Sequence, residues 1–239
     1  MNKAVRVVAI ATSTLALLAG GTIWQLAFRA PSVALLPLPG NLVSLTAVEG
    51  RRLLVEEAAA TTDYPSLTAA FESQRRPAFC GVASAVIVLN ALRRGPLLTQ
   101  ATFFADLPTD LRVTFAGMTL DELGSLLRQH GADVEIVHAQ DTTLEEFRFK
   151  VRENLSRARD YVLVNYQRSS LGQREGGHIS PLAAYSAPTD RFLILDVAAY
   201  RYPPVWVSTA DLWSAINTVD STSGRTRGFV VVRDGAPTS

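Results

Sequence analysis

The strongest constraint on the fold is a change of hydrophobic pattern near residue 160. Residues from about 80 to 159 have mainly helical patterns, whereas residues from about 160 to 233 form short β-rich runs bounded by turn residues. Helices first and antiparallel strands second predict an α+β fold, with a helical lobe packed on a sheet lobe. We expect a functional site between the two lobes.

Three helices are predicted in the first part from their end signals. One runs from near Cys80 to Arg94 and is stopped by Gly95-Pro96. The other two follow Thr119 and Thr143, each with a glutamate three residues later, which is the pattern of a capping box. We expect them to end at Gly131 and near Arg157.

Strands are predicted from short apolar runs. They cover residues 133–139, 161–166, 179–185, 192–197 and 228–233. Residues 186–190 form a predicted hairpin turn, and residues 208–217 form a helix before the last strand.

The amino terminus has the pattern of a targeting segment. Lys3 and Arg6 precede an uncharged run from Val7 to Phe28, which is long enough to span a bilayer as a helix. Bases on its N-terminal side favour export of the body. Residues 1–30 are therefore interpreted as a signal peptide or a signal anchor, residues 31–40 as a linker and residues 41–239 as the folded domain. We expect an exported protein, either periplasmic or membrane-anchored and facing the periplasm.

Charge and cysteine content exclude several classes of function. Apart from the three bases that flank the leader, the chain has 20 Lys and Arg residues against 22 acids, and a nucleic-acid-binding protein should have a basic excess. A single cysteine, Cys80, excludes an intramolecular disulfide and a Cys-rich metal site. Neither a P-loop nor a dinucleotide fingerprint occurs, and one Cys with three scattered His gives no zinc spacing.

Cys80 begins the first predicted helix. A thiol at that position faces unpaired backbone N–H groups and the positive end of the helix dipole, which lower its pKa. The alternative is a small core hydrophobe, which is the usual fate of a free cysteine. On its position alone the two interpretations are equal.

A second group of residues favours chemistry at Cys80. His178 follows two glycines and starts an apolar strand, and Asp196 ends the strand after the hairpin. Antiparallel neighbours can bring both to one end of the sheet, with Cys80 as nucleophile, His178 as base and Asp196 as the residue that orients it. Gln74 is a weaker candidate as donor to an oxyanion. His130, at a helix C-terminus, and His138, in a strand candidate, are assigned no catalytic role.

Several motifs, in this order, resemble the phytochelatin synthase family. They are Phe79-Cys80-Gly81-Val82-Ala83-Ser84, Gly117 to Leu123, Gly177-His178-Ile179-Ser180-Pro181, Ile194 to Ala198 and Tyr202 to Val207. The similarity covers roughly residues 40–233 and is greatest to short bacterial members that consist of the catalytic domain alone. It implies a papain-like cysteine-peptidase fold.

The resemblance also implies an activity. Members attack the carbonyl before the glycine of glutathione, release glycine and hold γ-glutamylcysteine as a thioester, which passes to water or to a second glutathione. Cys80, His178, Asp196 and Gln74 match the nucleophile, base, orienting residue and oxyanion donor. Asn165, Arg168 and Arg227 match positions that recognise the γ-glutamyl group.

The implied partners follow from the same resemblance. Glutathione is the substrate, the chemistry requires no cofactor, and heavy-metal ions such as cadmium enter as glutathione thiolate complexes. A homodimer and inner-membrane association through residues 7–28 are compatible with it. Two alternatives remain at this point: a papain-like peptidase that trims double-glycine leaders, and a non-enzymatic exported thiol or metal-binding module.

Overall fold

A computed structural model describes residues 20–22, 24–25, 27–56, 59–92, 96–174 and 176–235. Most of the predicted leader, and the predicted end of the first helix at Arg93–Gly95, lie outside these residues. Within them, no helix combines the length and the apolar character that crossing a bilayer requires.

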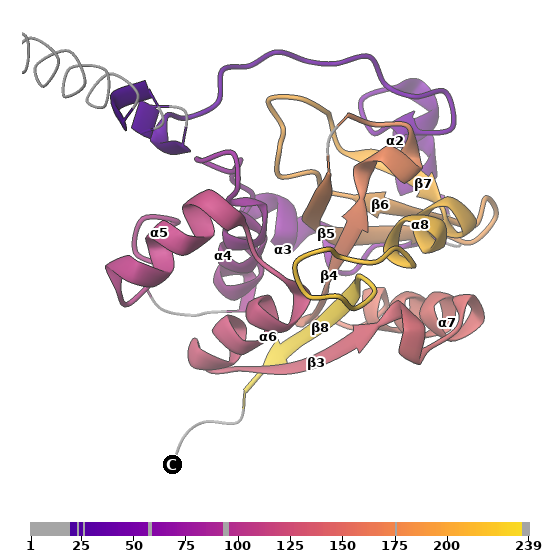
Figure 1. Ribbon diagram of the computed structural model, residues 1–239. Helices are drawn as coiled ribbons and strands as arrows, with labels where there is room; N and C mark the ends of the chain where they lie inside the picture. Colours follow the sequence, from indigo (N-terminus) through magenta and orange to yellow (C-terminus); the bar gives the residue numbers. More distant parts are fainter. Residues whose placement is uncertain are drawn as a thin grey trace, which may run out of the picture.

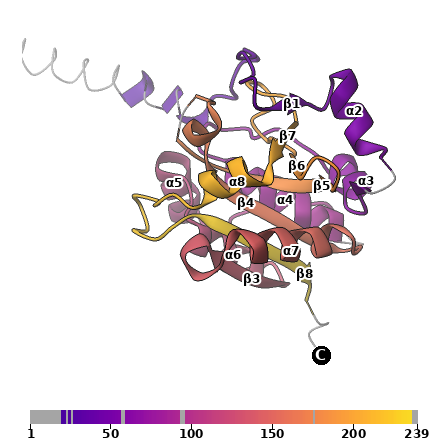
Figure 2. The ribbon, with the colours of Figure 1, turned by 90° about the vertical axis from the view of Figure 1, so that its right-hand side faces the viewer.

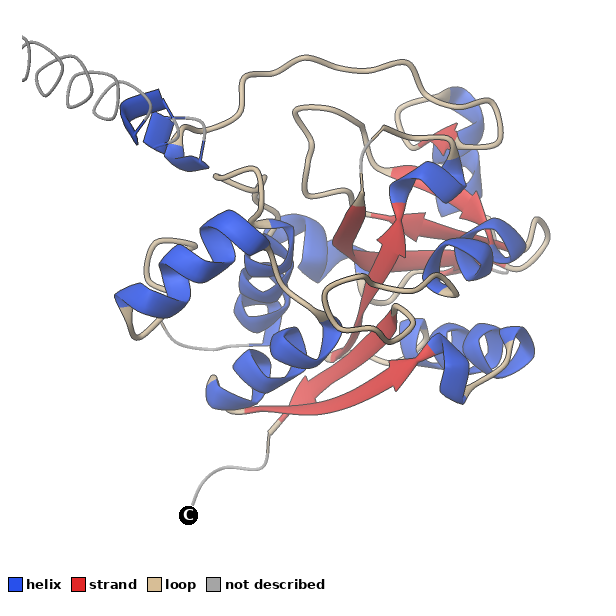
Figure 3. Ribbon diagram, viewed as in Figure 1, coloured by secondary structure: helices blue, strands red, loops and turns tan. Residues whose placement is uncertain are grey.

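The described chain contains both helices and strands (Figure 1, Figure 3). The helices are α2 (Val48–Leu54), α3 (Tyr64–Ala69), α4 (Cys80–Leu92), α5 (Leu107–Ala116), α6 (Leu120–Gln129), α7 (Leu144–Leu155) and α8 (Thr209–Ile216), with 3₁₀ turns η1 (Ala139–Asp141) and η2 (Arg168–Leu171). The strands are β1 (Val43–Ser44), β2 (Ala59–Ala60), β3 (Ala132–His138), β4 (Asp160–Gln167), β5 (Gly177–Ser186), β6 (Arg191–Ile194), β7 (Val205–Ser208) and β8 (Gly228–Asp234).

The strands form one antiparallel sheet. Its order is β1-β7-β6-β5-β4-β8-β3, and β2 pairs with β5 outside this path. Figure 2 shows this order from β1 and β7 at the upper edge to β3 and β8 at the lower edge. The longest strand, β5, lies in the middle and carries His178 near its start.

Helices cover both faces of the sheet. Alternate residues of β8 point to opposite sides: Val230 and Val232 pack in a cluster with α4 and α6, whereas Phe229 and Val231 pack in a cluster with α7 and α8. This double burial makes the central strands continuously apolar.

The α+β class with an antiparallel sheet is confirmed, but the division into a helical and a sheet lobe is not. β3, from the helical half of the chain, is an edge strand of the sheet, and α7, from the same half, packs on the sheet's other face. The two sequence halves therefore interleave in a layered structure.

Local end signals were the most reliable predictions. Both capping boxes form, Thr119 with Glu122 before α6 and Thr143 with Glu146 before α7. The first predicted helix begins at Cys80. Sequence analysis missed α2, α3, α5 and the strands β1, β2 and β7.

The segment predicted as a linker is hydrogen-bonded to the body. The Ala34 N–H donates to the Tyr200 carbonyl at 2.9 Å, and the Leu36 N–H donates to the Arg201 carbonyl at 2.9 Å. Closer to the leader, the Phe28 ring contacts the Phe115 ring edge-on at 6.0 Å and lies under the Arg76 guanidinium. Residues 28–36 thus run along the folded domain.

Candidate active site

Cys80 is the first residue of α4, so its N–H has no partner within the helix. The next residue, Gly81, allows the start of the helix to lie close to its neighbours: a Cβ there would be 3.0 Å from Met118 Sδ and 3.3 Å from Ile179 Cδ1. The Ser84 hydroxyl donates to the Ile179 carbonyl at 3.0 Å. These contacts fix the helix N-terminus against β5, directly beside His178.

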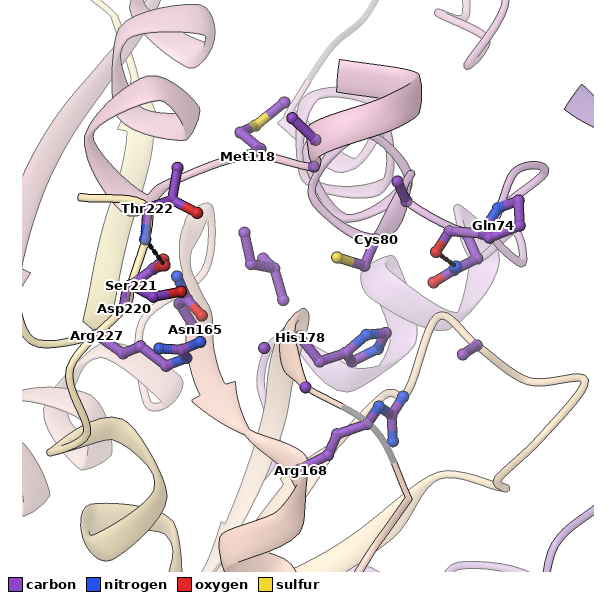
Figure 4. Close-up of a pocket in the computed structure, with 18 of the residues that line it drawn as sticks. Gln74, Cys80, Met118, Asn165, Arg168, His178, Asp220, Ser221, Thr222 and Arg227 are labelled. Carbon is purple, nitrogen blue, oxygen red and sulfur yellow. Dashed lines mark hydrogen bonds between the residues drawn. The ribbon is translucent and has the colours of Figure 1, made fainter. Parts of the chain in front are cut away.

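The three predicted catalytic residues meet at this point. Figure 4 shows the Cys80 thiol and the His178 imidazole next to each other, and both side chains line the same cavity. Nε2 of His178 lies 3.0 Å from Oδ1 of Asp196. Leu182 of β5 pairs with Ile194 of β6, and this register brings Asp196, two residues after β6, to the end of β5 that carries His178. The predicted juxtaposition is therefore present in the structure.

Asp196 has a second partner that the sequence did not reveal. The buried Arg168 guanidinium donates from Nη2 to Oδ1 of Asp196 at 2.7 Å and from Nη1 to Gln173 at 2.7 Å. It also lies over the Tyr202 ring. Arg168 lines the cavity. However, Nη1 and Nη2 of its guanidinium already donate to Gln173 and Asp196, so the structure shows it holding the aspartate rather than facing a substrate carboxylate.

The three side chains shift one another's pKa values. Burial raises the pKa of the Cys80 thiol, but the hydrogen bond and charge of His178, the Ile179 backbone and the charge of Arg168 together bring this pKa below its ordinary value. Burial and the charge of Arg168 lower the pKa of His178, yet Asp196 and the thiol hold it above its usual value. Burial opposes ionisation of Asp196, but His178 and Arg168 hold its pKa well below the usual range. These shifts all act in the direction of a thiolate–imidazolium pair supported by a carboxylate.

A cavity of about 360 Å³ opens beside the thiol. Its far wall carries Arg227, Asn165 and the backbone turn of Asp220 to Thr222, which face Cys80 across the space (Figure 4). Arg227 is nearly buried, and its Nε has no hydrogen-bond partner among the described residues. The Asn165 amide is also buried and lies on the same wall. Unused donors on such a wall are suited to a carboxylate ligand.

Asp220 was missed by sequence analysis. One of its carboxylate oxygens accepts the Thr222 N–H at 3.0 Å, and the residue lines the same wall as Arg227. A cation and an anion seven positions apart on one wall can recognise the carboxylate and the ammonium of an amino acid together. The signal in the sequence was only an isolated Asp-Ser-Thr turn, which is common in loops.

Gln74 also lines the cavity, but its amide nitrogen faces the protein. Nε2 lies 2.7 Å from the Pro77 carbonyl, 3.1 Å from the Arg76 carbonyl and 3.2 Å from the Tyr200 hydroxyl. Its Oε1 has no hydrogen-bond partner within the described part of the chain. An oxyanion role for Gln74 remains a prediction, and it requires the amide to release one of these carbonyls.

The other histidines lie away from this cavity. His130 Nε2 lies 2.9 Å from the Phe103 carbonyl, and His138 is the last residue of β3, where it pairs with Gly228 at the start of β8. No cluster of three or more His, Cys, Asp or Glu side chains suited to a metal ion occurs in the described part of the chain.

Comparison with known proteins agrees with the resemblance stated above. The family model described as phytochelatin synthase matches residues 33–229. Glutathione gamma-glutamylcysteinyltransferase 3 of Lotus japonicus is 34% identical over 207 residues, which cover 82% of this chain and 43% of the plant protein. Glutathione gamma-glutamylcysteinyltransferase 1 of Triticum aestivum is 36% identical over 214 residues, covering 84% and 43%.

A fungal relative extends the comparison. Glutathione gamma-glutamylcysteinyltransferase of Schizosaccharomyces pombe is 28% identical over 184 residues, covering 71% of this chain and 43% of the fungal protein. The chain thus spans less than half the length of these relatives. From the match over most of its length, together with the site just described, the chain belongs to the phytochelatin synthase family.

Proposed function

We propose that this chain cleaves glutathione through a γ-glutamylcysteinyl thioester on Cys80. The observation that carries the proposal is the placement of the Cys80, His178 and Asp196 side chains across one cavity from Arg227, Asn165 and Asp220. The arrangement agrees with a papain-like mechanism, in which the nucleophile begins a helix and the base lies on an antiparallel sheet. The relatives carry the name of this activity.

The γ-glutamyl end of glutathione is an amino acid with a free carboxylate and a free ammonium. We assign the carboxylate to Arg227, with Asn165 as a further donor, and the ammonium to Asp220. These contacts place the cysteinyl carbonyl toward Cys80 and leave the glycine pointing out of the pocket.

The chemistry then has two halves. The Cys80 thiolate forms a bond to the cysteinyl carbonyl carbon, the C–N bond to glycine breaks, and the His178 imidazolium gives its proton to the departing amine. In the second half an acceptor attacks the thioester while His178 takes its proton, and the thiolate leaves. The Cys80 N–H stabilises the oxyanion in both halves, with Gln74 as a second donor.

We propose that water is the main acceptor, which gives γ-Glu-Cys. Extension to phytochelatin needs a second glutathione, supplied as a metal thiolate, held near the thioester long enough to exclude water. This chain has no cysteine apart from the nucleophile to gather such a complex. Heavy-metal ions would enter only as part of the substrate.

Intact-mass spectrometry tests the first half. Incubation with glutathione should add one γ-Glu-Cys acyl group to the chain and release one glycine per acylation, and neither should occur in Cys80→Ala. Product analysis with and without cadmium tests the second half. If dimeric phytochelatin exceeds γ-Glu-Cys in both conditions, water is not the main acceptor. If long peptides with a double-glycine site are cleaved and glutathione is not, the peptidase alternative is correct.

A further inference from the structure

The two sides of the substrate cavity are joined behind the cavity by one buried histidine. Residues 218–227, which we call the binding loop, connect α8 to β8 and carry both Asp220 and Arg227. On the other side, Met118 lines the cavity immediately before α6. His138, at the end of β3, contacts the binding loop and α6 together.

The contacts of His138 are made by both ring nitrogens. Nδ1 lies 2.5 Å from the Thr226 carbonyl of the binding loop, and Nε2 lies 3.1 Å from Oδ1 of Asp121 in the first turn of α6. The side chain is 3% exposed. A backbone carbonyl of the loop and a carboxylate of the helix thus lie against the two nitrogens of one ring.

Other polar contacts reinforce the same junction. Arg225 of the binding loop lies 3.4 Å from Asp121 and 3.1 Å from Asp141 of η1. The Gln140 N–H donates to the Thr226 hydroxyl at 2.9 Å. Every one of these groups contacts the loop within two positions of Arg227, so they set where its guanidinium lies.

Gly228, the residue directly after the binding loop, lies close to the backbone of β3. It pairs with His138 in the sheet, and a Cβ there would be 2.0 Å from the Val137 carbonyl. The chain after the binding loop is therefore held directly against β3. The loop itself is fastened at Arg227, whose N–H donates to the Thr218 carbonyl at 2.8 Å.

We propose that His138 is a positioning residue for substrate recognition: it holds the binding loop and α6 together, so that Arg227 and Asp220 face the γ-glutamyl end of glutathione. This inference rests on the proposed function. His138 does not touch the cavity, and the nucleophile, base and aspartate are anchored by other elements. Its loss should therefore weaken binding and leave the chemical step nearly intact.

The test compares His138→Gln with His130→Gln in the full-length chain. His130 is a matched control, because it is a histidine that contacts a backbone carbonyl at the other end of α6. We expect His138→Gln to raise KM for glutathione at least fivefold with kcat within twofold of the parent. Hydrogen exchange of peptides covering residues 218–227 should become faster, while exchange in α7 stays unchanged. The control should alter none of these.

A surface variant covers the case in which His138→Gln fails to fold. Arg225→Gln removes only partly exposed contacts of the same loop, and it should raise KM about twofold with faster exchange in the loop. A fall in kcat at unchanged KM, or a loop with unchanged exchange, would overturn the proposal. If the parent chain releases no glycine from glutathione, the proposed function fails, while the exchange data still decide whether His138 holds the loop.

Discussion

The proton shared by Cys80 and His178 controls the reactivity of the thiol. Their pKa values are displaced in opposite directions, the thiol downward and the imidazole upward. These two shifts favour the thiolate–imidazolium pair. Activity that depends on the pair should fall where the pH is low enough to protonate the thiolate or high enough to deprotonate the imidazolium.

The rate of alkylation of Cys80 by iodoacetamide, measured against pH, reports the ionisation of the thiol directly, because the chain has one cysteine and only the thiolate reacts. We expect His178→Ala to move the midpoint of the rate–pH curve upward, since it removes the hydrogen bond and charge that lower the thiol pKa. His130→Ala is the control and should keep the parent midpoint. An unchanged midpoint in His178→Ala would show that the helix end alone ionises the thiol.

Asp63 gives a second prediction from a single side chain. It is fully buried at the start of α3, and neither carboxylate oxygen has a hydrogen-bond partner among the described residues. Burial, with the nearby charge of Asp160, raises the pKa of Asp63 to about 8. Between about pH 4 and pH 8 the folded chain holds a proton that the unfolded chain releases, so the free energy of unfolding falls as pH rises.

Asp63→Asn should remove this dependence. At pH 8 it should raise the free energy of unfolding by several kcal/mol and raise Tm accordingly, and at pH 4 it should have little effect. Thermal unfolding at the two pH values gives the measurement. Asp133→Asn, at an exposed carboxylate of β3, is the matched control. An equal gain at both pH values would contradict the assignment.

The roles of individual site residues could be predicted only where neighbouring residues in the sequence indicate them. Cys80 at a helix start and His178 after two glycines carry their own signal, and one hairpin accounts for the meeting of His178 with Asp196. Arg168 lies 28 positions before Asp196 in the chain. Its pairing depends on how η2 folds back over the end of β5, which no local pattern encodes.

Among the secondary-structure elements, β5 links the catalytic group to the substrate wall. Its first residue, Gly177, lies against the Arg227 guanidinium: a Cβ at Gly177 would be 2.6 Å from Nη2. The atom it meets is the end of a flexible side chain, so the strand can accept an alanine by displacing that guanidinium.

Gly177→Ala should therefore raise KM for glutathione by about tenfold, because hydrogen bonds to charged groups contribute about 1.5–3 kcal/mol each. Folding should be preserved. Gly176→Ala adds the same methyl group one residue earlier, where a Cβ meets no atom within 4 Å, and should leave KM near the parent value. Steady-state glycine release from both variants decides the matter; equal KM values would place Arg227 away from the substrate.

The elements also show where sequence patterns are sufficient. The capping boxes of α6 and α7 involve residues three positions apart, so local chemistry determines them. The start of α5 has a comparable signal, with Asp106 accepting the Thr109 N–H and a proline in the first turn. Sequence analysis did not predict α5 because its apolar residues follow only a weak helical pattern. The second helical layer was not predicted because it depends on β3 joining the far edge of the sheet.

For the whole molecule, we propose that residues 1–30 export or anchor the chain while the remainder folds without them. Deletion of residues 1–30 should leave a soluble chain with the parent rate of glycine release. Deletion of residues 1–36 is the informative comparison, since it also removes the hydrogen bonds of Ala34 and Leu36 to residues 200–201. We expect that variant to have a lower Tm.

Fractionation of cells that express residues 1–239 tests whether residues 1–30 export or anchor the chain. The protein should appear in the exported or membrane fraction. Recovery from the cytosol with its N-terminus intact would contradict the proposal, whatever the activity of the shortened chain.

The hydrogen bonds of Ala34 and Leu36 to residues 200–201 limit the distance between the cavity and an N-terminal membrane anchor. Tyr200 and Arg201, whose carbonyls accept these hydrogen bonds, also line the cavity. Only five peptide units separate Arg29 from Ala34, and a fully extended chain of that length spans at most about 18 Å. In an anchored molecule the active site would therefore stay close to the membrane surface, and it would meet only the glutathione present in a thin layer beside that surface.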